Sequence, residues 1–426
     1  MKGTTMSELK KEPFGFPTYV PQRAFGANER IIYGHIGVGG MGSSHIVADS
    51  CAAICDVDQN HLARAAKRVT GTPFLTDDYR RLLDRKDIDA VTIGTPDHWH
   101  GLMTVHACMA GKDVYSEKPT CKTIAEGLAM VAAARKYKRI VQIGSQGRSN
   151  PKVAAAANFL RNGQAGDIKK VVVWHPENLS SGTGFETPGN PPSTMNWDMW
   201  LGPIPYRPYT AETCHFNFRW MMDSGAGFIR DRGNHALSCV MLCTGQDNWS
   251  SPVTVKATGT PNPNRIYDAP QSMSVTWNFK NPNWTLVWEQ PGKVNERFEG
   301  EWGATYFGTK DDLVLIGGDG GADTEPKALD YTPPSTGFKH AVDPADVDVT
   351  EKHRRNWRHC IKTRERPVMD IEIGFKVIIL PIIANIAYQV GRELTYDPKL
   401  NRFINDEEAN RFLDDPYREP WSLKGY

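Results

Sequence analysis

A lysine followed by a proline closes a short β-rich run, 113–116, in the tripeptide Glu117-Lys118-Pro119. In open α/β sheets, ligands bind beyond the carboxyl ends of the strands. A lysine there can donate to a substrate hydroxyl and stabilise the alkoxide that forms on it. Because an isolated lysine near a turn is more often an exposed surface residue, Lys118 is a candidate that needs further support. The Lys118-Pro119 bond is also a candidate cis peptide.

A second group of reactive side chains lies in the segment 225–235, which reads GAGFIRDRGNH. Asp231 and His235 are four residues apart, so in a helix they share one face, where the carboxylate can orient the imidazole and support its protonated form. The ordinary alternatives are a helix cap for Asp231 and a hydrogen-bonded core histidine for His235. These residues therefore form a candidate acid and base pair.

A glycine-rich turn precedes both groups. Residues 37–42 read GVGGMG and fit the pattern G-x-G-x-x-G, directly after the apolar run 31–36. Such glycines permit a tight turn and close approach of the backbone to a pyrophosphate. The next β-rich run ends in Asp56, where a carboxylate can accept from ribose hydroxyls and would repel a 2'-phosphate. The pattern therefore predicts a dinucleotide site that favours NAD over NADP.

The elements that would position these groups alternate between strands and helices in the first part of the chain. Strands are expected at 31–37, 52–57, 89–94, 113–116 and 140–144, and helices at 40–49, 59–69, 77–84, 98–110 and 123–137. This alternation is typical of a parallel sheet that is covered on both faces. The fold class predicted for residues 31–149 is α/β, a Rossmann dinucleotide-binding domain, after an extended arm at 1–30.

The pattern changes after a helix expected at 151–163. Strand-like runs at 169–174, 253–259, 272–279, 284–289 and 303–307 follow without intervening helices, which predicts an open, mostly antiparallel sheet. A long irregular segment, 176–224, is rich in Pro, Gly and aromatic residues, and loops of this length are usually functional. Residues 351–392 return to helical periodicity, and their most apolar stretch is expected to be a buried helix. We assign 150–426 to one α+β substrate-binding and oligomerisation domain.

Composition narrows the classes of partner. Lys plus Arg is 50 against Asp plus Glu at 49, so the net charge of +1 gives no electrostatic reason to expect nucleic acid or a membrane surface. The eight cysteines include no C-x-x-C pair, so we interpret them as reduced thiols. The polar residues 1–12 resemble no export signal, so we expect a cytoplasmic protein, or a periplasmic one if a signal has been removed.

At this point the chain resembles the Gfo/Idh/MocA oxidoreductase family. The resemblance covers roughly residues 25–426 and rests on several motifs besides the glycine turn and Asp56. These motifs are 95–100 (TPDHWH), 117–119 (EKP), 144–148 (GSQGR), 197–203 (WDMWLGP), 218–220 (FRW), 231–235 (DRGNH), 370–374 (DIEIG), 406–410 (DEEAN) and 420–421 (PW). It implies an NAD-dependent enzyme with a Rossmann domain and an open α/β domain.

The resemblance also implies roles for single residues. Lys118 would stabilise the incipient oxyanion, His235 would take the hydroxyl proton, and Asp231 would hold the imidazole while hydride leaves for the nicotinamide. The implied cofactor contacts are Gly37, Gly39, Gly40, Met41, Gly42, Asp56, Thr95, Pro96, His98, Trp99, His100, Glu117 and Lys118. The expected substrate contacts are Lys118, Arg148, Tyr209, His215, Arg219, Arg232 and His235. No metal is expected, since His98 and His100 lack a third ligand at an informative spacing.

Three hypotheses for function follow. The first is an NAD-dependent oxidoreductase acting on a secondary hydroxyl of a sugar or sugar derivative. The second is an NAD-dependent glycosidase that oxidises a ring hydroxyl only transiently, eliminates the aglycone, adds water and reduces the ring again. The third is a non-catalytic sugar or NAD sensor, which would not need the lysine, acid and histidine together.

A homo-oligomer, a dimer or a tetramer, is also expected. We interpret one face of the second sheet as apolar and in need of a partner subunit, on the basis of Val253, Val255, Val275, Trp277, Leu286 and Trp288.

Overall fold

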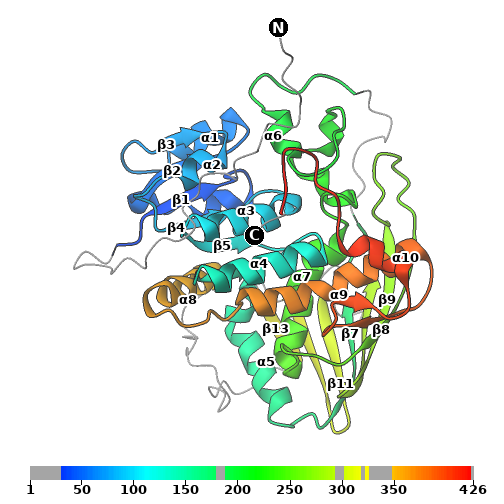
Figure 1. Ribbon diagram of the computed structural model, residues 1–426. Coiled ribbons are helices and arrows are strands. Elements are labelled where there is room, and N and C mark those ends of the chain that lie inside the picture. Colours follow the sequence, from blue (N-terminus) through cyan, green and yellow to red (C-terminus); the bar gives the residue numbers. More distant parts are fainter. Residues whose placement is uncertain (1–29, 179–187, 293–301, 318–321, 326–347, 424–426) are drawn as a thin grey trace.

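Two sheets organise the chain in the computed structural model, which describes residues 30–178, 188–292, 302–317, 322–325 and 348–423. Figure 1 shows the first sheet in blue and cyan, and most strands of the second sheet in green and yellow below it. The arm predicted at 1–30 lies outside the described residues except for Arg30, and so does part of the irregular segment 176–224.

The first sheet is parallel and has the strand order β3-β2-β1-β4-β5-β6. Its strands are β1 (Tyr33–Ile36), β2 (Cys51–Cys55), β3 (Phe74–Thr76), β4 (Ala90–Ile93), β5 (Asp113–Glu117) and β6 (Val141–Gly144). Because β1 has β2 on one side and β4 on the other, the order reverses there, and a crevice opens beyond the carboxyl ends of these strands. The five predicted strands are confirmed, while the three-residue β3 was missed.

The helices of this domain are α1 (Gln59–Ala66), α2 (Tyr79–Leu83), α3 (His100–Met109) and α4 (Ile124–Lys136). The prediction of a helix at 40–49 is wrong. Met41–His45 and Ala48–Ser50 form two short 3-10 turns separated by extended backbone. The hydroxyls of Ser43 and Ser44 donate to the carbonyls of Gly40 and Met41, and such local bonds compete with a regular helix.

The second sheet has nine strands in the order β13-β12-β11-β7-β10-β9-β8-β14-β15. They are β7 (Ile168–Trp174), β8 (Val253–Thr260), β9 (Ser272–Lys280), β10 (Asn283–Gln290), β11 (Gly303–Gly308), β12 (Asp312–Gly317), β13 (Ala322–Glu325), β14 (Leu394–Asp397) and β15 (Arg402–Phe403). All neighbours pair antiparallel except β7 and β10. The mostly antiparallel sheet is thus confirmed, although the sequence did not reveal β12 to β15.

Helices separate the strands of the second domain more than predicted. They are α5 (Pro151–Arg161), α6 (Trp197–Leu201), α7 (Phe228–Thr244), α8 (Val349–Thr363), α9 (Ile371–Val390) and α10 (Glu407–Asn410). The long α7 lies between β7 and β8 in the sequence, so these strands do not follow one another directly. It also carries Asp231 and His235 on the expected helix.

The six apolar residues that we interpreted as an uncovered sheet face are buried inside this chain. Val253, Val255 and Trp277 are fully buried, and Trp277 Nε1 donates to the carbonyl of Leu380 in α9. The chain's own helices therefore cover that face. The opposite face carries exposed polar residues such as Lys256 and Asn278, so the original reason for expecting a partner subunit is wrong.

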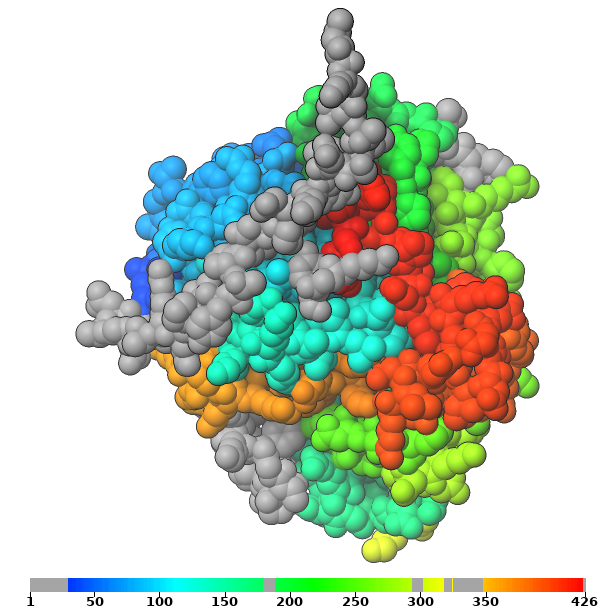
Figure 2. Space-filling view, viewed as in Figure 1, coloured from blue at the N-terminus to red at the C-terminus, as the bar shows by residue number. Residues whose placement is uncertain are grey.

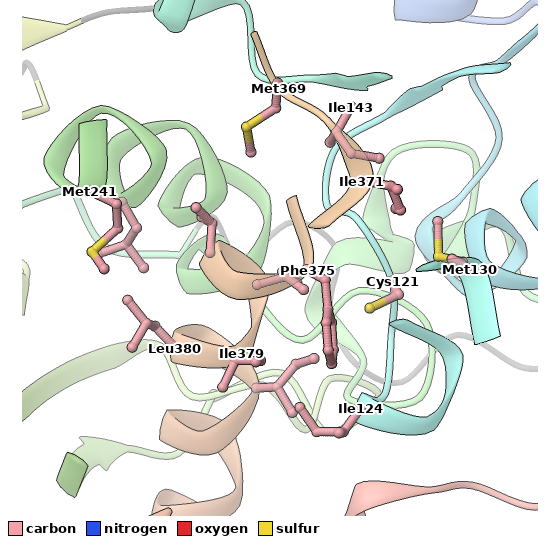
Figure 3. Close-up of a cluster of buried hydrophobic side chains, with 14 of the residues drawn as sticks. Cys121, Ile124, Met130, Ile143, Met241, Met369, Ile371, Phe375, Ile379 and Leu380 are labelled. Atoms are coloured by element: carbon pink, nitrogen blue, oxygen red, sulfur yellow. The ribbon is translucent and has the colours of Figure 1, made fainter. Parts of the chain in front are cut away.

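Helix α9 is the central helix of the second domain. It is the one described helix long and apolar enough to cross a membrane, but 78% of its most apolar window is buried inside the protein. Figure 3 shows Phe375 of α9 pointing toward Cys121 and Ile124, while Leu380 lies near Met241 of α7. The prediction of a buried helix is confirmed.

Helix α8 belongs to the first sheet by its packing, although it comes late in the chain. Its Trp357, Cys360 and Ile361 form a buried cluster with Tyr33 of β1 and Tyr115 of β5. The helical region predicted at 351–392 is therefore two helices with different partners, and the C-terminal part of the chain contributes to both domains.

The last described segment also crosses between the domains. The N–H of Arg418 donates to the carbonyl of Pro203, and Trp421 packs against Trp99 and Tyr79 of the first domain. In the space-filling view the C-terminal segment, in red, lies against the green segment that contains α6 (Figure 2). Contacts at several places thus fix the two domains around the crevice.

Candidate active site

A cavity of about 660 Å³ lies at the crevice between the two domains. Residues of the glycine turn, the ends of β2, β4 and β5, the segment 215–219 and the start of α7 line it, and α8 contributes Thr350. Lys118, Asp231 and His235 all line this one cavity, as the proposed chemistry requires.

The glycine turn has the geometry that the motif predicts. Gly37 has a φ of +72°, and a Cβ atom placed on it would lie 2.7 Å from the backbone nitrogen of Thr95. A Cβ atom on Gly42 would overlap the carbonyl oxygen of Gly37. Both positions therefore require glycine, whereas Gly40 faces open space.

Asp56 follows β2 and faces the turn. Its Oδ2 accepts from the N–H of Val38 at 2.8 Å, and its Oδ1 accepts from the N–H of Asp58 at 3.0 Å. The buried carboxylate thus stands against the glycine turn, where it was predicted to meet ribose hydroxyls.

The Lys118 ammonium pairs with Oδ1 of Asp231. The other oxygen of Asp231, Oδ2, lies 3.3 Å from Nε of Arg219. Burial alone raises the pKa of Asp231, but the charges of Lys118 and Arg219 outweigh it and hold the pKa well below its usual value. Asp231 was predicted to hold the His235 imidazole; in the structure its two oxygens face Lys118 and Arg219, so it holds the lysine between the two domains.

Glu117, next to Lys118, is anchored on three sides. Its Oε1 accepts from Nε2 of His45 at 2.8 Å and from Nε2 of Gln146 at 2.9 Å, and its Oε2 accepts from the N–H of Lys118. Burial raises the pKa of Glu117, but the His45 hydrogen bond and the nearby positive charges overcome this and lower the pKa to about 2. Glu117 is therefore a fixed anion that orients the backbone of the lysine.

Asp97 also lines the cavity, on the turn after β4. Among the residues that the structure describes, none forms a hydrogen bond to its buried Oδ2. Burial and, next, the negative charge of Asp231 raise the pKa of Asp97 to about 8, although Arg219 and Lys118 oppose the shift. The cavity thus holds a carboxyl group that is largely protonated at neutral pH.

Most of the predicted cofactor and substrate residues are brought together here. Those that line the cavity, besides Lys118, Asp231 and His235, are Gly37, Gly39, Gly40, Met41, Asp56, Thr95, Pro96, Trp99, Glu117, His215, Arg219 and Arg232. The tertiary structure adds lining residues to which the sequence assigned no role, among them Asp97, His61, Met199, Phe218 and Thr350. Asp97, Met199 and Phe218 lie inside the motifs 95–100, 197–203 and 218–220, so the sequence could have signalled these three.

Five predicted residues do not line the cavity, namely Gly42, His98, His100, Arg148 and Tyr209. His98 Nε2 bonds to the carbonyl of Trp200, and burial lowers its pKa to about 3, so it is a neutral structural link. His100 lies between the carbonyls of Pro119 and Thr95.

Arg148 is buried and pairs with Asp247, and it donates to the carbonyls of Ser238 and Val368. Tyr209 packs edge-on against Trp197, with ring centroids 5.2 Å apart. These two residues therefore support the second domain and do not face the substrate space. The Lys118-Pro119 peptide is cis, as the sequence suggested.

Comparisons with known proteins agree with this architecture. Residues 31–145 match the family model GFO_IDH_MocA, described as an oxidoreductase family with an NAD-binding Rossmann fold. Residues 173–312 and 339–423 match the model of the family's C-terminal alpha/beta domain. Together the two models cover most of the chain.

Matches to individual proteins cover less of the chain than the two family models do. A levoglucosan dehydrogenase from Pseudarthrobacter phenanthrenivorans is 31% identical over 149 residues, which are 32% of this chain and 38% of the relative. A glycosyl hydrolase family 109 protein from Shewanella putrefaciens is 31% identical over 150 residues, 32% of each chain. The chain thus spans about a third of the length of these two curated relatives.

Among solved structures, the WlbA dehydrogenase from Bordetella pertussis in complex with NADH and UDP-GlcNAcA has a similar fold. The TM-score is 0.62 at 16% identity, and the match covers 85% of this chain and 98% of that one. This likeness concerns the fold alone.

Proposed function

Because this chain belongs to the Gfo/Idh/MocA oxidoreductase family, we propose that it transfers a hydride between a secondary hydroxyl of a sugar or sugar derivative and the nicotinamide of NAD. The observation that carries the proposal is the convergence of Lys118, Asp231 and His235 on the cavity that also contains the glycine turn. An amine and an imidazole from separate domains can then reach one hydroxyl.

The residues present fit a dinucleotide. Gly37 and Gly42 leave no room for a side chain at the turn, and Asp56 presents a carboxylate beside it. A carboxylate suits the free ribose hydroxyls of NAD and would repel the phosphate of NADP. When bound, NAD supplies the hydride acceptor.

Each protein group has a task in this reaction. The Lys118 ammonium stabilises negative charge on the substrate oxygen as its proton leaves, and His235 accepts that proton. Asp231 and Glu117 position the lysine from opposite sides, one through the ammonium and one through the backbone N–H. Arg219 offsets the charge of Asp231, so that the carboxylate does not fully neutralise the lysine.

One assay tests this function directly. The full chain is incubated with NAD and a panel of sugars and nitrophenyl glycosides, while reduced cofactor and released phenol are followed separately. NADH in proportion to the sugar consumed is the expected result. Phenol release without net NADH would overturn the proposal in favour of a glycosidase, and no hydride transfer with any sugar would favour a sensor.

The glycosidase is retained as a second candidate because of Asp97. Elimination and re-addition of a leaving group need an acid that carries a proton at neutral pH, and burial gives Asp97 a pKa of about 8 within the same cavity. The relatives named as family 109 glycosyl hydrolases are consistent with such chemistry. In that case Asp97→Asn would remove phenol release but leave NAD binding intact.

We further propose that the chain forms a homo-oligomer. The face of the second sheet opposite α9 offers β-branched residues, including Val172, Thr276 and Thr285, beside exposed polar ones. Sheet faces can pack against each other when their outward side chains interdigitate, so this face could pack against a second copy. Light scattering of the eluted protein at micromolar concentration should give a multiple of 47.6 kDa, whereas a monomeric mass would contradict the proposal.

A further inference from the structure

Three side chains with metal-binding atoms meet at the edge of the cavity. Two come from the first domain and one from the second, and none of them is close to Lys118 in the sequence. Asp58 is the N-cap of α1, His61 lies in the first turn of that helix, and His215 comes from the irregular segment of the second domain. His215 Nε2 is 3.0 Å from Oδ2 of Asp58, and His61 Nε2 is 4.0 Å from the same oxygen. One ligand atom from each residue lies within 4.8 Å of the others.

We propose that Asp58, His61 and His215 form a binding site for a divalent transition metal of the zinc type. Zn²⁺ binds imidazole nitrogen and carboxylate oxygen at about 2.0 to 2.2 Å, so tetrahedral ligand atoms lie roughly 3.3 Å apart. The two separations given above lie on either side of that value. Calcium and magnesium prefer oxygen ligands, so two histidines select against them.

Residues next to the site orient its ligand atoms. Nδ1 of His61 lies 3.3 Å from Oδ2 of Asp56, and a carboxylate there favours the proton on Nδ1 and leaves the lone pair of Nε2 for a metal. Oδ1 of Asp58 accepts from the N–H of Asn60, which directs Oδ2 toward the two histidines. The ring centroids of His61 and His215 are 4.5 Å apart.

The site is open to entry and incomplete without a small ligand. The side chain of His215 is 43% exposed, while that of Asp58 is 12% exposed. Three protein ligands leave the fourth tetrahedral position to water or to a bound molecule, which distinguishes such a site from a closed structural one. The metal would therefore reach it from solvent and link α1 to the second domain.

Occupation by a metal has a consequence for the glycine turn, and this step rests on the dinucleotide site proposed above. A Cβ atom placed on Gly39 would lie 2.9 Å from Cε1 of His61, so the imidazole covers the backbone that a pyrophosphate must approach. The same ring engages Asp56. A metal bound to His61 would hold the ring in this position, so metal and dinucleotide compete, and each lowers the affinity for the other by the same factor.

The test uses the full chain after treatment with a chelator. Zn²⁺ is titrated calorimetrically, and Co²⁺ is added as a spectroscopic probe of tetrahedral coordination. One metal per chain is expected, with about a tenfold or greater loss of affinity in each of His61→Ala, His215→Ala and Asp58→Asn. Because Asn caps a helix as well as Asp does, Asp58→Asn removes the ligand charge without removing the cap.

Matched controls separate this site from general binding to histidine. His359 is an exposed histidine in α8 that lies 3.7 Å from Glu365, and His359→Ala should leave the metal affinity unchanged. Thermal unfolding of each variant without metal verifies that the fold is intact. Equal metal affinity in the wild type and in folded His61→Ala and His215→Ala would overturn the site.

Competition is measured by repeating the zinc titration at rising NAD concentration. The apparent affinity for zinc should fall in proportion to NAD, and NAD binding should weaken equally as zinc is added. If zinc binds with the same affinity at saturating NAD, the exclusion is wrong. Absence of any NAD binding, by contrast, would contradict the dinucleotide site and not the metal ligands.

Discussion

The carboxyl ends of two neighbouring strands, β4 and β5, each place a buried carboxyl group beside the same cavity, yet the pKa values of the two groups shift in opposite directions. Glu117 has two side-chain donors and a backbone N–H, and its pKa falls to about 2. Asp97 has no hydrogen bond to its Oδ2 among the described residues and lies near Asp231, and its pKa rises to about 8. Burial penalises the charge in both cases, so the partners decide which group is ionised.

This contrast suggests a division of work. A permanently charged Glu117 can hold the lysine backbone in one place through the whole reaction. A protonated Asp97 can instead donate to an oxygen of the substrate, which a carboxylate cannot do. Lys118 acts on both carboxyl groups, because its positive charge lowers the pKa of each.

The largest effect is expected from Lys118→Ala, which removes the cation shared by both acids. We expect kcat/KM to fall by about 10² to 10⁴, because the developing alkoxide loses its partner, while NAD still binds to the glycine turn. Steady-state kinetics and quenching of intrinsic fluorescence by NAD measure the two properties. Unchanged turnover would exclude Lys118 from the mechanism.

Asp97→Asn should change the pH dependence of stability. Between the ordinary pKa of 3.8 and about 8, the folded protein binds a proton at Asp97 that the unfolded chain does not. The free energy of unfolding of the wild type should therefore fall as pH rises through this window, by roughly 1 kcal/mol per unit from this group.

The Asn variant should lack that contribution, and urea unfolding from pH 5 to 8 would reveal the difference. Identical slopes in the two proteins would mean that Asp97 is ionised in the fold. The contrast between the two acids would then disappear.

Glu117→Gln tests the carboxyl group whose pKa is lowered by the fold. A pKa lowered from 4.5 to about 2 stabilises the fold above pH 4.5 by on the order of 3 kcal/mol, and this contribution is lost as pH falls toward 2. The difference in unfolding free energy between wild type and variant should therefore be largest near neutral pH and shrink below pH 4.5. A difference that grows in acid would contradict the assignment of Glu117 as an anion.

The smallest effect is expected at Tyr209, which the sequence suggested as a substrate contact. The structure packs this residue against Trp197, outside the cavity. Tyr209→Phe should therefore keep KM and kcat within about twofold of the wild-type values, since a substitution away from the reacting groups leaves them in place. A tenfold rise in KM would contradict this placement and indicate that Tyr209 contacts the substrate.

Local patterns were sufficient for much of the site. The turn 37–42, the acid at the end of β2 and the lysine at the end of β5 each depend on a few consecutive residues, and the parallel sheet brings the ends of its strands to one edge. The same logic explains why five of the six strands could be predicted. The helix at 40–49 could not be judged correctly, because serine hydroxyls and the backbone compete for the same carbonyls.

Contacts between distant residues required the tertiary structure. His45 and Glu117 are 72 residues apart, and Lys118 and Asp231 are 113 apart, yet these pairs set the charges in the cavity. Arg148 lies in a motif but forms an ion pair with Asp247, and α8 packs on the first sheet although it lies between strands of the second sheet in the sequence. The sequence by itself determined which chemical groups and which strand ends are present. Only the folded chain decided which acid stays protonated and which cations face it, because pKa values depend on burial and on neighbours that no local pattern encodes.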